Sequence, residues 1–127
     1  MNENKRMKEL RILLADDQER VRYALRALLR QQPGWKVTGE AENAKDLLAL
    51  AAVLDSDLVL LDWNLPDMAG EKVLFSLRRN YKGIPIIVLS GQIEVKSAAL
   101  EAGANAFFSK ASPPSQLLET IQNVIKI

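Results

Sequence analysis

Short apolar runs alternate with longer segments of helical periodicity along most of the chain. The runs predict five strands, at Arg11–Ala15, Trp35–Glu40, Leu58–Asp62, Ile86–Leu89 and Ala106–Lys110. The first, third and fourth runs are almost continuously apolar, which is typical of parallel strands covered on both faces, whereas the second alternates and suits an edge. This strict alternation of strands and helices predicts an α/β fold built on a parallel sheet.

A helix is predicted after each strand. The predicted segments are Glu19–Gln32, a helix from an Asn43 cap to about Leu54, a helix that carries Val73, Leu74 and Leu77, Ile93–Ala102, and a last helix with an apolar stripe at Leu117, Leu118, Ile121, Val124 and Ile125. Gly103 suits the position just after the fourth helix. Ser112 is expected to cap the last helix, with the two prolines that follow it in the first turn.

The fourth predicted helix carries a stripe of small residues. They are Val95, Ala98, Ala99 and Ala102, which share one face at three- and four-residue spacing. This face should pack on the sheet, so Leu100 is expected to point outward as a candidate contact for a partner.

Polar residues follow four of the predicted strands at their carboxyl ends. They are Asp16-Asp17, Asp62, Ser90 and Lys110. In open α/β sheets, ligands bind in the crevice outside the carboxyl ends of the strands. Three carboxylates, a hydroxyl and an ammonium group are therefore expected to meet in one crevice, and this set suits a divalent cation and a phosphoryl group.

Each of these signals also has a simpler explanation when it is taken alone. The pair Asp16-Asp17 suits a hard divalent cation, but it also suits a turn or an N-cap before the first helix. Asp62 can act as a nucleophile toward phosphorus, or it can merely close a turn. Ser90 and Lys110 can contact a phosphoryl group, or they can be an ordinary strand-end serine and a solvated lysine. The coincidence of all four at one sheet edge favours the functional interpretation.

Composition narrows the function further. The chain has no histidine and no cysteine, so a metal site must use oxygen ligands, as Mg²⁺, Mn²⁺ and Ca²⁺ do. Lys and Arg number 17 against 16 Asp and Glu, and this balance argues against nucleic-acid binding by this chain. Four arginines, Arg20, Arg22, Arg26 and Arg30, are interpreted as the solvated face of the first helix. No apolar stretch of about 18 residues and no secretory signal is present, which predicts a cytoplasmic protein without a membrane span.

The whole set of motifs resembles one known family. The matching residues are Asp16-Asp17, the stretch from Asp62 to Gly70, Ser90-Gly91, Gly103-Ala104 leading to Phe107, and Lys110. In order, spacing and strand context this set resembles the receiver domain of bacterial two-component response regulators. The resemblance implies a receiver domain over residues 11–127, after a polar lead-in at residues 1–10. It also implies a flavodoxin-like, doubly wound fold, with strand order 2-1-3-4-5 and helices on both faces.

The resemblance implies a phosphorylation site. Asp62 would accept a phosphoryl group from a histidine kinase or a small-molecule donor in a Mg²⁺-dependent reaction, with Mn²⁺ as an alternative ion. The side chains of Asp17 and Asp62 and the backbone carbonyl of Asn64 would bind the ion, and Asp16 would act through water.

The resemblance also implies a switch. Ser90 and Lys110 would contact the phosphoryl group. Ser90 and the ring of Phe107 would then reposition the surface made by the fourth helix, the fifth strand and the fifth helix. This surface, with Leu100 on it, would serve output to an effector domain or partner protein, or a phosphorylation-dependent homodimer.

Two departures from the usual family pattern lead to further expectations. Ala111 follows Lys110 where the family often has a cis-proline, and a cis bond before alanine would cost about 2.5–4 kcal/mol, so we expect a trans bond. Asn64 and Gln92 stand two residues after the phosphoacceptor and the switch hydroxyl. Because amide side chains can orient an attacking water, the phosphoryl group is expected to hydrolyse faster than it would beside bulky apolar residues.

Three other functions remain as alternatives. A receiver-like module that binds partners without phosphorylation keeps the fold, but it usually loses acidic or lysine positions that this chain retains. A phosphohydrolase with an aspartyl nucleophile typically needs a second acid two residues later, where this chain has Asn64, so enzymatic turnover of an external substrate is disfavoured. A flavodoxin-like cofactor carrier lacks support, because no phosphate-cradling loop follows the first strand.

Overall fold

The computed structural model describes residues 9–125. Its strands are β1 (Leu10–Ala15), β2 (Trp35–Ala41), β3 (Leu58–Asp62), β4 (Ile86–Ser90) and β5 (Ala106–Ser109). Its α-helices are α2 (Glu19–Leu29), α3 (Ala44–Val53), α4 (Gly70–Asn80), α5 (Lys96–Glu101) and α6 (Ser115–Ile125), with a 3₁₀ turn, η1 (Ile93–Val95), before α5. The predicted lead-in at residues 1–10 lies mostly outside the described residues, and Leu10 already belongs to β1.

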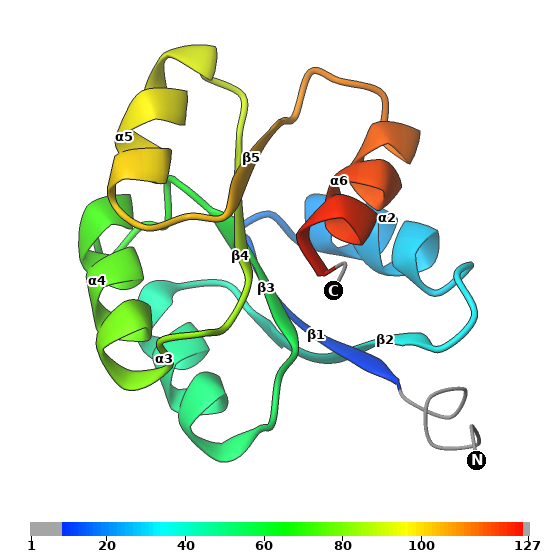
Figure 1. The fold of residues 1–127 in the computed structure, drawn as a ribbon, viewed down its shortest axis with the longest axis horizontal. Coiled ribbons are helices and arrows are strands. Elements are labelled where there is room, and N and C mark those ends of the chain that lie inside the picture. Colours follow the sequence, from blue (N-terminus) through cyan, green and yellow to red (C-terminus); the bar gives the residue numbers. More distant parts are fainter. Residues whose placement is uncertain (1–8, 126–127) are drawn as a thin grey trace.

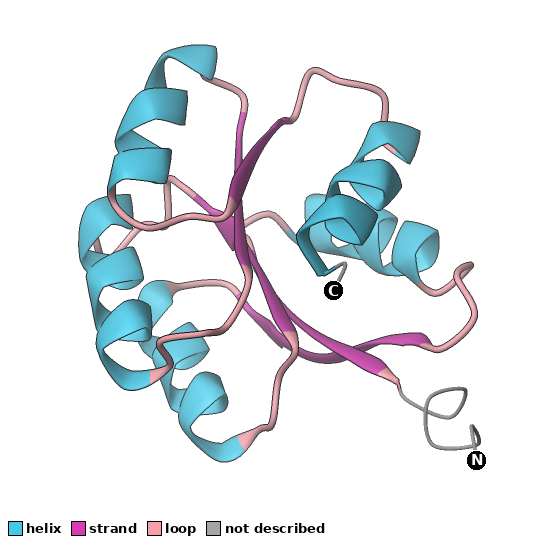
Figure 2. Ribbon diagram, viewed as in Figure 1, coloured by secondary structure: helices cyan, strands magenta, loops and turns pink. Residues whose placement is uncertain are grey.

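The five strands form one parallel sheet in the order β2-β1-β3-β4-β5. This order confirms the predicted doubly wound fold. Helices α3, α4 and α5 cover one face of the sheet, and α2 and α6 cover the other (Figure 1). The strands therefore form the middle of three layers (Figure 2).

Each face of the sheet has its own apolar core. Leu13, Val59 and Val88 point to the side of α3, α4 and α5, whereas Leu14 and Leu60 point to the side of α2 and α6. Successive residues of a strand point to opposite faces, so a strand covered on both sides must be apolar throughout. All residues of β3 and β4 are buried, which confirms the interpretation of their continuous apolar runs.

The observed ends of the helices agree only in part with those predicted from the sequence. Asn43 caps α3 as predicted, because its side chain accepts a hydrogen bond from the Asp46 N–H at 2.7 Å. Gly103 has a φ of 115° after α5, a conformation that glycine adopts readily. The expectation for Ser112 is wrong: α6 begins at Ser115, three residues later, and both prolines precede the helix.

Two helices are shorter than predicted. The helix α2 ends at Leu29 instead of Gln32, since the chain already turns toward Gly34, which has a φ of 82°. The fourth predicted helix begins with the 3₁₀ turn, and only Lys96–Glu101 is α-helical. Its small-residue stripe faces the sheet as expected, with Ala99 fully buried, and Leu100 is 40% exposed.

Candidate functional site

Three carboxylates meet at the carboxyl edge of the sheet. Asp16 directly follows β1, Asp17 comes next, and Asp62 is the last residue of β3, the neighbouring strand. One carboxylate oxygen from each residue lies within 4.8 Å of the others. Asp16 and Asp62 are buried, whereas Asp17 is exposed. A hard cation that takes oxygen ligands fits this donor set, and Asp17 leaves one side of the set open to solvent.

Lys110 reaches into this cluster from the end of β5. Its Nζ donates a hydrogen bond to Oδ2 of Asp16 at 2.7 Å and lies 3.4 Å from Oδ1 of Asp62. The bond between Lys110 and Ala111 is trans, as predicted, because the described residues contain no cis peptide bond. The ammonium group thus partly balances two buried negative charges.

The charge balance in the cluster is incomplete. Burial raises the pKa of Asp62, and the negative charge of Asp16 raises it further, while Lys110 works in the opposite direction. For Lys110, burial disfavours the charged form, but the hydrogen bond to Asp16 and the charge of Asp62 outweigh it and raise its pKa. The ionised Asp62 carboxylate is therefore under-compensated, and an additional cation would stabilise it.

The strand-end side chains also make local turn bonds. Asp16 Oδ1 accepts the Gln18 N–H at 2.9 Å, and Ser90 Oγ accepts the Gln92 N–H at 3.0 Å. Asp62 Oδ1 accepts the Asn64 N–H at 3.3 Å. The simpler interpretation as turn residues is thus correct as well, and each turn fixes its side chain at the sheet edge. The side chains of Asn64 and Gln92 are exposed.

The loop between β3 and α4 is anchored at several points. The ring of Trp63 lies on Gly70, where an added Cβ would approach Cε3 of the ring to 2.5 Å. Leu65 is buried in the core. Asp67 accepts the N–H groups of Ala44 and Lys45 at 2.7 and 3.0 Å, and these bonds lower its pKa. Sequence reasoning did not assign this role to Asp67.

A second connection that sequence reasoning missed involves two of the four arginines. Arg22 donates a hydrogen bond to the backbone carbonyl of Asp16 at 2.6 Å and pairs with Glu40 at 3.3 Å. Arg26 pairs with the same glutamate. The interpretation as a solvated face is therefore wrong for Arg22, whose side chain is 15% exposed, whereas Arg26 pairs with Glu40 of β2 while its side chain stays 39% exposed. The paired acid at position 40 could not be recognised from helical periodicity.

The predicted switch residues lie on the neighbouring part of the sheet. Phe107 is a partly buried residue of β5, at the level of Val88 on β4, and it packs against the core beneath α5. Leu100 lies on α5. Ser90, at the end of β4, is buried, as its position between the acidic cluster and β5 requires.

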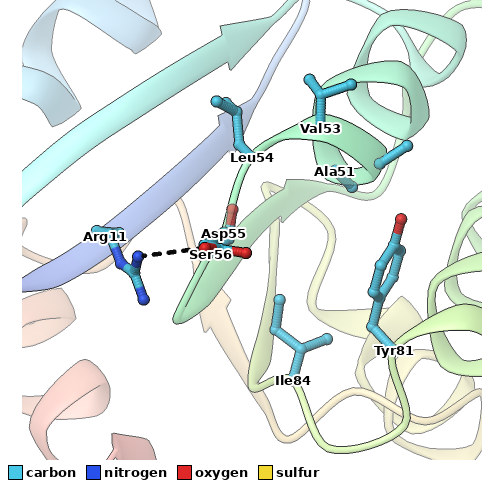
Figure 3. A pocket seen from close by; sticks show the side chains of 9 residues that line it. Arg11, Ala51, Val53, Leu54, Asp55, Ser56, Tyr81 and Ile84 are labelled. Carbon is cyan, nitrogen blue, oxygen red and sulfur yellow. Dashed lines mark ion pairs between the residues drawn. The ribbon is translucent and has the colours of Figure 1, made fainter.

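A pocket of about 340 Å³ lies at the opposite, amino edge of the sheet (Figure 3). None of the predicted site residues lines it. Its lining includes Arg11, Asp55, Ser56 and Tyr81. Ser56 Oγ is the one buried side-chain oxygen or nitrogen in residues 9–125 that has no hydrogen-bond partner. The pocket is therefore separate from the acidic cluster.

No helix within the described part of the chain is long and apolar enough to cross a membrane.

Comparison with known proteins supports the same family. The nitrate/nitrite response regulator NarP of Escherichia coli (strain K12) is 36% identical over 87% of this chain and 53% of its own length. The response regulator UvrY of the same strain is 30% identical over 91% of this chain and 54% of its own length. The chain thus spans about half the length of these curated relatives.

Solved structures show the same fold. A LuxR-family two-component response regulator from Aurantimonas sp. SI85-9A1 superposes with a TM-score of 0.88 at 28% identity, over 93% of this chain and 86% of that one. A CheY-like receiver domain protein from Methanospirillum hungatei JF-1 gives a TM-score of 0.84 at 30% identity, over 93% and 94% of the two chains.

The model of one protein family covers most of the chain. The family described as the response regulator receiver domain matches residues 12–122, which include the acidic cluster, Ser90 and Lys110. With this match and the NarP and UvrY similarities, the chain belongs to the response regulator receiver domain family, and it is the receiver domain of a two-component response regulator.

Proposed function

We propose that the chain is a phosphorylation-driven switch that accepts a phosphoryl group on Asp62. The observation that carries this proposal is the under-compensated, buried Asp62 carboxylate, held within 4.8 Å of two further carboxylates and 3.4 Å from an ammonium group. In the reaction, a carboxylate oxygen of Asp62 attacks phosphorus, a P–O bond forms, and the P–N bond to the histidine of a kinase breaks. Imidazole is the leaving group.

The carboxylates fit a divalent ion. We infer that Asp17 and Asp62 bind Mg²⁺, or Mn²⁺, together with the backbone carbonyl of Asn64, and that Asp16 acts through water. When bound, the ion neutralises phosphoryl oxygens and helps orient the donor. Asp16 also holds Lys110 at the cluster, since the hydrogen bond between them is 2.7 Å long.

Ser90 and Lys110 are the groups that we assign to the phosphoryl oxygens. The Ser90 hydroxyl can donate one hydrogen bond, and the Lys110 ammonium group can turn from the carboxylates toward the phosphoryl group. Movement of Ser90 would displace β5, because Ser90 is paired with Ser109 of that strand. The same register places Phe107 of β5 beside Val88 of β4. The surface of α5, β5 and α6, with Leu100 on it, is our candidate for output or homodimerisation.

The phosphoryl group would be lost by hydrolysis. A water molecule attacks phosphorus, the Asp62 carboxylate is regenerated, and inorganic phosphate leaves. We propose that the amides of Asn64 and Gln92 orient this water, and the variant Asn64→Met/Gln92→Leu tests the idea. A hydrolysis rate equal to that of the wild type would rule it out. Turnover of an external substrate is not proposed, because Asn64 cannot serve as a proton donor in the way that a second acid would.

The first test uses tryptophan fluorescence. Trp63 is adjacent to Asp62, and Trp35→Phe removes the distant tryptophan. The Trp35→Phe protein is titrated with Mg²⁺ and then with beryllofluoride, a phosphoryl mimic. The Trp35→Phe/Asp62→Ala variant is titrated in parallel as the control. We expect a saturable Mg²⁺ response, followed by a Mg²⁺-dependent beryllofluoride response that the Asp62→Ala variant lacks. A folded protein without either response would contradict the proposal and favour a module that binds partners without phosphorylation.

The partners follow from the family. We propose that this protein is cytoplasmic and that a histidine kinase is its phosphodonor. NarP and UvrY are response regulators about twice as long as the matched segment. An effector domain in the same polypeptide, or a separate partner protein, would receive the signal, and this chain itself is not expected to bind nucleic acid.

A further inference from the structure

Asp67 connects two loops that are distant in sequence. It lies in the segment between β3 and α4, five residues after Asp62. Its two carboxylate oxygens accept different N–H groups at the beginning of α3, Ala44 at 2.7 Å and Lys45 at 3.0 Å. The Asp67 side chain thus connects the loop that carries Asn64 to the N-terminus of α3.

This bridge completes the capping of α3. The first N–H groups of an α-helix have no partner within the helix. Asn43 is the local cap and accepts the Asp46 N–H at 2.7 Å, while Asp67 accepts the two preceding N–H groups. The helix terminus therefore anchors the carboxylate, because each of its two oxygens accepts a separate backbone N–H group.

We propose that Asp67 is a positioning residue for the metal-binding loop. By tying the loop to α3, Asp67 would restrict the movement of the Asn64 backbone, whose carbonyl we assign to the divalent ion. The inference rests on the proposed function, since it assigns Asn64 to the ion.

Three features of the loop support this role. The Trp63 ring on Gly70 and the buried Leu65 fix the loop against the sheet and α4. Both side chains belong to the apolar core that also contains Ala44 and Leu47 of α3, and Asp67 adds hydrogen bonds from the loop to the first backbone N–H groups of that helix. Asp67 is also exposed, so its two hydrogen bonds, and not burial, determine where its side chain lies. Removing a group that is hydrogen-bonded directly to a metal ligand typically weakens metal binding by about 10- to 100-fold. Because Asp67 acts on the loop and not directly on a ligand, we expect an effect at the lower end of this range.

The test compares Mg²⁺ affinity in matched variants of the whole chain, followed by Trp63 fluorescence in the Trp35→Phe background. Asp67→Ala removes the bridge and should weaken Mg²⁺ binding by about tenfold. Asn43→Ala removes the local cap of the same helix and leaves the bridge intact. Asp46→Asn removes a carboxylate from the same helix terminus, and so controls for the lost negative charge. Both control variants should bind Mg²⁺ with an affinity within about twofold of the wild type.

Hydrogen exchange provides a readout that does not involve the metal. In the Asp67→Ala variant, the amides of Ala44 and Lys45 and also that of Asn64 should exchange faster than in the wild type. In the Asn43→Ala variant, only the first turn of α3 should lose protection.

The outcomes separate this inference from the proposed function. If the wild type binds Mg²⁺, Asp62→Ala does not, and Asp67→Ala binds as tightly as the wild type, the positioning role is overturned while the proposed function stands. Equal weakening by Asp67→Ala and Asn43→Ala would also overturn it, because the effect would then come from the helix end alone. A wild type without saturable Mg²⁺ binding would overturn both.

Discussion

Lys110 donates its hydrogen bond to Asp16, at 2.7 Å, whereas Asp62 lies farther from the same Nζ, at 3.4 Å. Lys110 is therefore bound mainly to the carboxylate that we do not assign as phosphoacceptor. Asp62 is therefore the less tightly paired of the two buried carboxylates.

Lys110→Met should destabilise the protein, because it leaves the buried Asp16 carboxylate without its ammonium partner. We expect a loss of about 2 kcal/mol in the free energy of unfolding, measured by urea denaturation without metal. Adding Asp16→Asn should recover much of this loss, since the unpaired charge is then gone. Equal stability of wild type and Lys110→Met would show that the Lys110–Asp16 ion pair makes no net contribution to the free energy of unfolding.

Gly70→Ala should disturb the loop through Trp63. The new Cβ would meet the indole ring at 2.5 Å, so the ring must move. Overpacking of this kind costs about 1–3 kcal/mol, which exceeds the gain of up to about 1 kcal/mol that alanine brings to a helix. We expect lower stability in urea and a shifted Trp63 emission maximum. Gly83→Ala is the control, because nothing lies within 4 Å of its Cβ position. An unchanged emission maximum in Gly70→Ala would contradict the packing argument.

Arg22 and Arg26 should differ in their coupling to Glu40. The side chain of Arg22 is 15% exposed and that of Arg26 is 39% exposed. Double-mutant cycles with alanine should give a coupling of about 1 kcal/mol or more for Arg22–Glu40, and about 0.5 kcal/mol for Arg26–Glu40. Raising the salt concentration should weaken the Arg26 pair more. The reverse order of coupling would mean that burial does not decide the strength of these pairs.

Asp67 should make stability depend on pH in the acid range. Its pKa is lowered in the folded protein, first by the bond from Ala44 N–H and then by that from Lys45. The folded state therefore binds this proton less tightly than the unfolded state does. The stabilisation is complete above the unfolded pKa of about 4 and is lost as pH falls through the lower folded value. The stability difference between wild type and Asp67→Asn should thus shrink between pH 5 and acid pH, as followed by thermal unfolding. A stability difference that stays constant over this pH range would contradict the lowered pKa of Asp67 in the folded protein.

Ser56→Ala should not weaken the fold. Ser56 lines the pocket at the amino edge of the sheet (Figure 3). Its Oγ is buried and has no hydrogen-bond partner. Because a buried hydroxyl without a partner is unfavourable, its removal should raise the free energy of unfolding by up to about 1 kcal/mol. A comparable loss of stability in urea would reveal that the hydroxyl is satisfied in solution.

The strand pattern was sufficient for the fold and for the gathering of the site. Asp16, Asp62, Ser90 and Lys110 each stand at the end of an apolar run, and parallel strands necessarily bring those ends to one edge. The small-residue face of the fourth predicted helix also packs as expected, since periodicity records which side of a helix is buried. The ends of elements were less certain, as the shorter α2 and the late start of α6 show, because local turns compete there with helix formation.

Sequence alone determined which residues reach the carboxyl edge, but the tertiary structure decided how they are held there. Burial of Asp16 and exposure of its neighbour Asp17 follow from the direction of the turn after β1. The Arg22–Glu40 pair and the bridge from Asp67 to α3 join segments that are far apart in the chain. Hydrophobic periodicity reports one face of one element at a time. Contacts between polar side chains of different loops depend on how the layers pack, so they become visible only in three dimensions.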